Sequence, residues 1–193
     1  MVAKKVERGE ILPIADYETI RERFRARVIA EKQPRRIPLG EHMSAVFENH
    51  DTVLLQIQEM LRTERITSES GIAHEIETYN ELCPNDGELS ITLFVEIPEK
   101  EERDRRLVEL LGLEDHIALE IDGEKIPAFG KRPDDGMGRT TAVHYLKFAL
   151  SDAARKAVSS KKAQVALLVN HPKHSSRVEL GAETRTSLAG DLV

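Results

Sequence analysis

The 193-residue sequence contains one cysteine and no tryptophan, and aromatic residues make up only 4% of it. The single cysteine, Cys83, has no partner for an internal disulfide, and one thiol cannot supply the cysteine set of an iron–sulfur cluster. The N-terminal stretch MVAKKVERGEILP lacks the apolar region of a secretory signal. These features predict a cytoplasmic protein in a reducing compartment.

Long apolar runs are also missing, since none approaches the ~20 residues that cross a bilayer, so we expect no membrane partner. Positive charge is scarce in the middle of the chain: residues 41–104 carry 4 Lys/Arg against 16 Asp/Glu, while the whole chain has a net charge of −6. An acidic surface with few aromatics argues against a nucleic-acid partner, because it offers neither phosphate contacts nor a base-stacking platform.

The segment Ser44–Ile66 has the longest clear period, with apolar residues along one stripe at helical spacing, and it predicts a single amphipathic helix. His50 lies within that stripe and Glu59 on its flank. One further helix is predicted before it, over Ile14–Lys32, and one after it, over Ser68–Leu82.

Alternating apolar and polar residues dominate the second half of the chain. A helix over Glu99–Leu111 interrupts the strands, and a short one follows Ser151. We therefore predict an α+β fold, with N-terminal helices packed on one face of a mainly antiparallel four- to five-stranded sheet. Residues 1–172 are expected to form a single α+β domain, with a loose arm over 1–12, a loop over 130–139 and a flexible C-terminal tail over 173–193. The predicted strands are Glu88–Pro98, His116–Ile121, Lys125–Phe129, Thr140–Leu150 and Gln164–Asn170.

Histidines are the most suggestive candidates for chemistry. His144 lies on the more apolar face of its predicted strand, so it is either a hydrogen-bonded core histidine or a ligand. His171 follows the last predicted strand. A divalent metal would need a carboxylate beside these histidines, and we expect Glu59 to face the strand of His144. The candidate metal ligands are His144, His171, Glu59, Glu75 and Glu77.

Catalytic motifs are otherwise lacking. The run His74-Glu75-Ile76-Glu77-Thr78 has Thr where the zinc-protease helix needs its second His. No serine nucleophile elbow is present, and Cys83 has no histidine near it in the sequence. Whether the protein is an enzyme is left open by these residues.

Several stretches together resemble an uncharacterised bacterial family, a domain of unknown function of about this length. The resemblance covers roughly residues 10–172. It implies that such proteins are encoded beside a rubrerythrin-like di-iron protein and an iron–sulfur protein similar to heterodisulfide reductase subunits, and it assigns no catalytic residue. The stretches that carry it are FENHDTVLLQIQEMLRTERI (47–66), HEIETYNEL (74–82), GELSITLFVEIP (87–98), TAVHYLKFAL (141–150) and VNHP (169–172).

Three hypotheses follow. The first is an accessory or interaction protein of a cytoplasmic redox or peroxide-defence system, which docks through its acidic middle and has the rubrerythrin-like protein or the iron–sulfur protein as its partner. The second is a metal-dependent enzyme or metal-binding protein that uses the ligands above. The third is a small-molecule binding domain with a pocket between the central helix and the sheet, lined by Tyr79, Tyr145 and His144.

Overall fold

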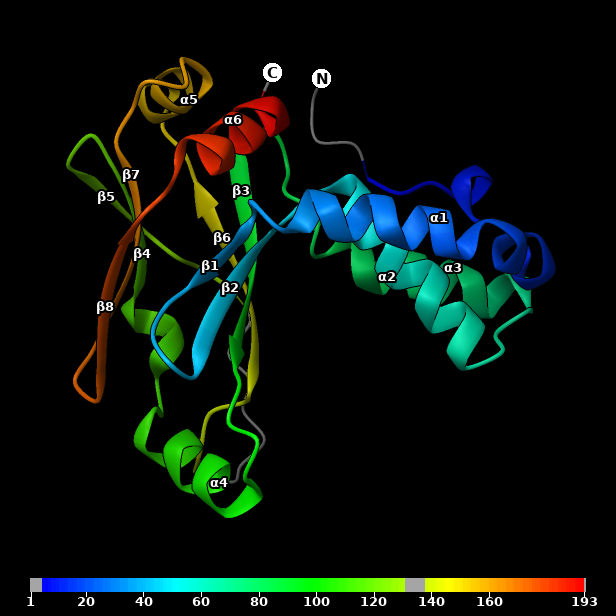
Figure 1. Cartoon of the computed structure of the whole chain (residues 1–193), viewed down its shortest axis with the longest axis horizontal. Coiled ribbons are helices and arrows are strands. Elements are labelled where there is room, and N and C mark those ends of the chain that lie inside the picture. Colours follow the sequence, from blue (N-terminus) through cyan, green and yellow to red (C-terminus); the bar gives the residue numbers. More distant parts are fainter. Residues whose placement is uncertain (1–4, 131–137, 193) are drawn as a thin grey trace.

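The computed structural model describes residues 5–130 and 138–192, and it confirms the α+β class (Figure 1). Most of the loop predicted over 130–139 lies outside these residues. No helix in the described part of the chain is long and apolar enough to cross a membrane.

The strands divide between two antiparallel sheets of four strands each, where one sheet of four to five strands was expected. The first sheet has the strand order β1-β2-β3-β6 and the second the order β5-β4-β7-β8. The first contains β1 (Arg36–Pro38), β2 (Met43–Glu48), β3 (Glu88–Val95) and β6 (Val143–Ala149). The second contains β4 (Ile117–Ile121), β5 (Glu124–Pro127), β7 (Val165–His171) and β8 (His174–Glu179).

The two sheets meet edge to edge beside β6. Phe129, just after β5, pairs with Lys147 of β6 through two backbone hydrogen bonds, with N···O distances of 2.9 and 2.8 Å. The eight strands therefore form a half-closed layer around one interior.

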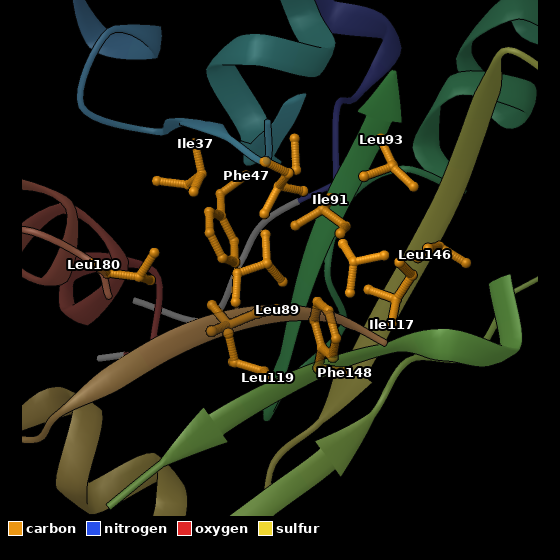
Figure 2. Packing of buried hydrophobic residues seen from close by; sticks show 14 of the residues in the cluster. Ile37, Phe47, Leu89, Ile91, Leu93, Ile117, Leu119, Leu146, Phe148 and Leu180 are labelled. Carbon is orange, nitrogen blue, oxygen red and sulfur yellow. The ribbon is translucent and has the colours of Figure 1, made fainter. Parts of the chain in front are cut away.

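The main core fills the space between the two sheets (Figure 2). Alternate residues of each strand point into it, as the period of two requires. Leu89, Ile91 and Leu93 of β3 and Phe148 of β6 enter it from the first sheet, and Leu119 of β4 enters it from the second. The opposite side chains of β3 and β6 lie on the outer face of the first sheet.

The N-terminal helices form a separate layer beside the first sheet, on the side away from the second sheet (Figure 1). They have a small core of their own, which includes Val53, Ile57 and Leu61 of α2. The layer consists of the 3-10 helix η1 (Arg8–Glu10), α1 (Ile14–Lys32), α2 (His50–Thr63) and α3 (Glu69–Asn80).

The other helices close the two ends of the layered sheets (Figure 1). Helix α4 (Lys100–Glu109) and the 3-10 helix η2 (Leu113–His116) lie at one end. Helices α5 (Asp152–Ser159) and α6 (Ala182–Asp191) lie at the other.

The single helix predicted over Ser44–Ile66 is confirmed over His50–Thr63 and wrong before it. Strand β2 occupies its first part, and Asn49 then caps α2, where its side chain accepts a hydrogen bond from the backbone N–H of Thr52. Every residue of β2 is buried, because one face of the strand meets the main core and the helical layer lies beside the other. Val46 lies on the same face as Ser44 and Glu48 and interrupts their polar alternation, so the apolar pair Val46 and Phe47 also fitted the helical stripe.

The flexible tail predicted over 173–193 is also wrong. Strand β8 pairs with β7 from Ala166↔Glu179 to His171↔His174, and α6 buries Leu188 in the main core. The loose arm predicted over 1–12 is wrong where the chain is described, because Val6 and Ile11 are buried in the core of the helical layer.

Candidate functional site

His144 is a core residue of the interior. Its side chain lies on the inner face of β6 opposite Leu93, and the residue is 3% exposed. Its Nε2 shares a hydrogen bond with Thr140 Oγ1 at 3.2 Å. Burial lowers the pKa of the imidazole, although the nearby Glu114 acts in the opposite direction. Of the two roles expected for His144, the structure therefore supports that of a neutral histidine in the core.

His171 is buried at the end of β7, in the other sheet. Its Nε2 donates to the Leu111 carbonyl at 3.2 Å, and its Nδ1 accepts from the Lys173 backbone N–H at 3.1 Å. The ring also packs edge-on against His116, with centroids 4.9 Å apart. Because both nitrogens already have partners, neither is free to bind a metal in this arrangement.

Glu59 joins two helices and does not face β6, which corrects the expectation drawn from the sequence. It accepts hydrogen bonds from Tyr17 Oη at 2.7 Å and from the Arg21 guanidinium, whose two contacts are both 2.8 Å. The Arg21 hydrogen bond lowers the pKa of Glu59 to about 2. The carboxylate therefore acts as a structural link between α1 and α2.

The candidate metal ligands are not brought to one place. Glu75 and Glu77 lie on α3, in the helical layer, and only Glu75 is partly buried. Within residues 5–130 and 138–192, no group of three or more His, Cys, Asp or Glu side chains is arranged to hold a metal ion.

A pocket of about 550 Å³ lies between the end of α3 and the outer face of β6. Its aromatic lining residues are Tyr79 of α3, Tyr145 of β6, and Phe129, which follows β5. Phe129 is 47% exposed and Tyr145 is 52% exposed. These are large apolar side chains to leave in water, because burying one such side chain contributes about 1.5–3 kcal/mol.

The alternation of side chains along β6 also determines which polar residues line the pocket. Residues 144, 146 and 148 point inward, so Tyr145 and Lys147 point into the pocket. Ser90 of β3 is the cross-strand partner of Lys147 and also lines the pocket, although the residue is only 2% exposed.

Two local contacts shape the walls of the pocket. Asn80 holds the N-terminal segment against α3, since its side chain accepts from Val6 N at 2.8 Å and donates to Val6 O at 2.9 Å. This clamp places the neighbouring Lys5 in the pocket lining. Gly130 approaches β6 so closely that a Cβ there would lie 2.4 Å from the Tyr145 carbonyl oxygen, so only glycine fits.

Tyr145 and Lys147 are the hydrogen-bond donors that β6 contributes to the pocket. Burial, then Tyr79 and Glu48, raise the pKa of Tyr145, so its phenol stays protonated at neutral pH. Lys147 forms an ion pair with Glu88 at 3.4 Å. The nearby Cys83 is fully buried, and burial raises its thiol pKa to about 11, which makes it a poor nucleophile.

Two of the three residues named for a small-molecule pocket line this one. Tyr79 and Tyr145 line a pocket between a helix and the sheet, as predicted, but the helix is α3 and His144 faces the opposite way. Sequence reasoning missed Lys5, Ser90, Phe129 and Lys147. The alternation of TTAVHYLKFAL already places Lys147 on the face of Tyr145, whereas nothing local indicates Phe129 or Lys5.

Comparison with known proteins supports the family resemblance. The model of the family described as "Protein of unknown function (DUF3501)" matches residues 5–192. The chain is similar to a novel protein of unknown function from Burkholderia pseudomallei K96243, whose crystal structure is known. The two sequences are 32% identical, the TM-score is 0.92, and the match covers 98% of this chain and 100% of that one. No curated protein matches the sequence. The chain belongs to the DUF3501 family.

Proposed function

We propose that this protein binds a small organic molecule with an apolar or aromatic body in the pocket between α3 and β6. The observation that carries the proposal is a pocket of about 550 Å³ with three aromatic side chains in its lining. Ligand pockets for molecules of drug size are typically 300–1,000 Å³ and are mostly apolar with a few placed polar groups. The α3–β6 pocket has this composition.

The aromatic residues of the pocket are available to a ligand. Among the described residues, no ring–ring contact involves Tyr79, Phe129 or Tyr145. Covering the half-exposed rings of Phe129 and Tyr145 would remove apolar surface from water, which is the main driving force for such binding.

The lining favours binding over nucleophilic catalysis. The described residues that form it include no histidine and no cysteine, and its one carboxylate, Glu81, is an exposed residue. A nucleophile with an adjacent base is the usual signature of covalent catalysis, and the described lining does not assemble that pair.

The test uses N-phenyl-1-naphthylamine, a neutral aromatic probe that fluoresces when it leaves water. The full chain should bind one equivalent. Tyr145→Ala and Phe129→Ala should each weaken binding by about tenfold, since losing an aromatic contact costs on the order of 1.4 kcal/mol. Leu111→Ala is the matched control, because Leu111 is a 58% exposed apolar residue outside the pocket. Equal losses in Leu111→Ala, or no saturable binding, would refute the proposal.

The accessory role in a cytoplasmic redox or peroxide-defence system stays a prediction, supported by the family resemblance and the acidic segment 41–104. It is compatible with ligand binding, because an accessory protein can carry or sense a small molecule. Its test is co-purification with the rubrerythrin-like protein or the iron–sulfur protein at low salt, and capture of neither protein would count against it.

A further inference from the structure

We propose that the ligand of the α3–β6 pocket is an aromatic anion, a flat ring system with one carboxylate or similar acidic group, and that Lys147 and Ser90 hold the acidic group. This inference rests on the proposed function, because it names the chemical class of the molecule that the pocket takes.

Lys147 is positioned to bind a second anion. Its backbone is fixed on both sides, by β3 and by Phe129, so the side chain starts from a rigid strand. The side chain is 18% exposed and therefore partly desolvated. Its contact with Glu88 Oε2 is 3.4 Å, and the same oxygen accepts two shorter hydrogen bonds from Asn85 at 2.9 and 2.8 Å. The ammonium has three donors, so this single long contact leaves capacity for another acceptor.

Ser90 supplies a hydroxyl beside that ammonium. It lies directly opposite Lys147 on the neighbouring strand, and side chains in such cross-strand pairs lie next to each other. The residue is almost fully buried and lines the pocket, and its hydroxyl makes no hydrogen bond to another described residue. An acidic group of a ligand in the pocket would give this hydroxyl an acceptor.

The remaining charges of the pocket agree with an anionic ligand. Among the described residues that line it, Lys5 and Lys147 are positive and Glu81 is negative, and Lys147 also pairs with Glu88. The protonated phenol of Tyr145 adds a further neutral donor. The rings of Phe129, Tyr79 and Tyr145 would then cover the aromatic part of the ligand.

Two probes with the same ring skeleton test this inference. 1-Anilinonaphthalene-8-sulfonate carries one sulfonate, whereas N-phenyl-1-naphthylamine is neutral. The wild-type chain should bind the sulfonate about tenfold more tightly, which is the usual gain from one charge-assisted hydrogen-bond pair. 1-Naphthoate should displace the bound sulfonate, and the cation 1-naphthylmethylamine should not.

Variants assign the preference to the residues. Lys147→Met should remove the tenfold preference for the sulfonate over the neutral probe, and Ser90→Ala should reduce that preference about threefold. Lys147→Arg keeps the charge and should keep the preference, which guards against a folding defect in Lys147→Met. Lys125→Met is the matched control, since Lys125 is exposed on β5 outside the pocket lining.

The outcomes separate the two proposals. Equal affinity for both probes, or an unchanged preference in Lys147→Met, would overturn the anionic ligand while leaving a small-molecule pocket in place. A loss in Lys125→Met as large as in Lys147→Met would place the sulfonate on the general surface and would also overturn it. If neither probe binds, both proposals are refuted together.

Discussion

The two faces of strand β6 use the same backbone for different purposes. The inner face presents His144, Leu146 and Phe148 to an interior between two sheets, where each is at most 3% exposed. The outer face presents Tyr145 and Lys147 to a pocket that is open at its mouth. Adjacent residues therefore belong to a closed core and to an open pocket, so neighbours in one strand can lie in quite different environments.

The largest expected effect is a difference in the free energy of unfolding between substitutions on the inner face and on the outer face of β6. Phe148 is fully buried, so Phe148→Ala should lower the free energy of unfolding by about 3–5 kcal/mol, the usual result of leaving a large cavity in a core. Tyr145→Ala should cost less than about 1 kcal/mol, because the side chain is half exposed. Urea denaturation followed by circular dichroism gives both values, and equal losses would contradict the division between the faces.

The closed part of the molecule extends to the C-terminal helix. Arg35 is buried and pairs with Asp191 of α6 at 2.6 Å, while its Nε donates to the Phe47 carbonyl at 2.8 Å. Arg35→Met should lower the free energy of unfolding by about 3–5 kcal/mol, because it leaves a buried carboxylate without its charged partner.

The double variant Arg35→Met/Asp191→Asn is the control for Arg35. It should recover part of that loss, since the unpaired charge is gone. If residues 173–193 were a flexible tail, the second substitution, at Asp191, would recover nothing in urea unfolding.

Histidines in the two layers should give stability opposite dependences on pH. Burial lowers the pKa of His144, so the unfolded chain takes up a proton more readily and His144 makes stability fall as pH falls below about 6.5. Burial also acts to lower the pKa of His50, but the hydrogen bond of Nδ1 to Asp51 at 2.8 Å and the Glu10 carboxylate, 3.0 Å from Nε2, outweigh it and raise the pKa.

The His50 contribution is therefore fully present below about pH 6.5 and is lost as pH rises through the raised pKa of the folded state. Urea denaturation between pH 5 and 8 should show that His50→Gln removes the loss at high pH and that His144→Leu removes the loss at low pH. The reverse assignment would contradict the environments described for the two rings.

The smallest stability effect is expected at His144 itself at neutral pH. Its Nδ1 has no hydrogen-bond partner among the described residues. His144→Leu should change the free energy of unfolding by less than about 1 kcal/mol, because an apolar side chain of similar size replaces an incompletely bonded polar one. Thermal unfolding at pH 7.5 measures this, and a loss above about 3 kcal/mol would indicate a network that stabilises the fold through this ring.

The sequence predicts those elements whose periods are local. Helix α1 has the predicted bounds, and β3 and β6 follow from strict alternation in Glu88–Pro98 and Thr140–Leu150. Strand β2 was missed because it is buried on both faces and Val46 interrupts the alternation of Ser44 and Glu48. Strand β8 was missed because HSSRVE is mostly polar and gains its order from pairing with β7. The pocket combines segments near residues 5, 79, 90, 129 and 145, and no local pattern predicts that meeting.

The most direct test compares adjacent residues of β6 in one binding measurement. N-phenyl-1-naphthylamine is titrated into the wild-type chain, Tyr145→Ala and His144→Leu, and the dissociation constants are compared. A pocket on the outer face predicts binding about tenfold weaker in Tyr145→Ala and unchanged within about twofold in His144→Leu. Binding that His144→Leu abolishes and Tyr145→Ala preserves would place the site in the interior and contradict the account.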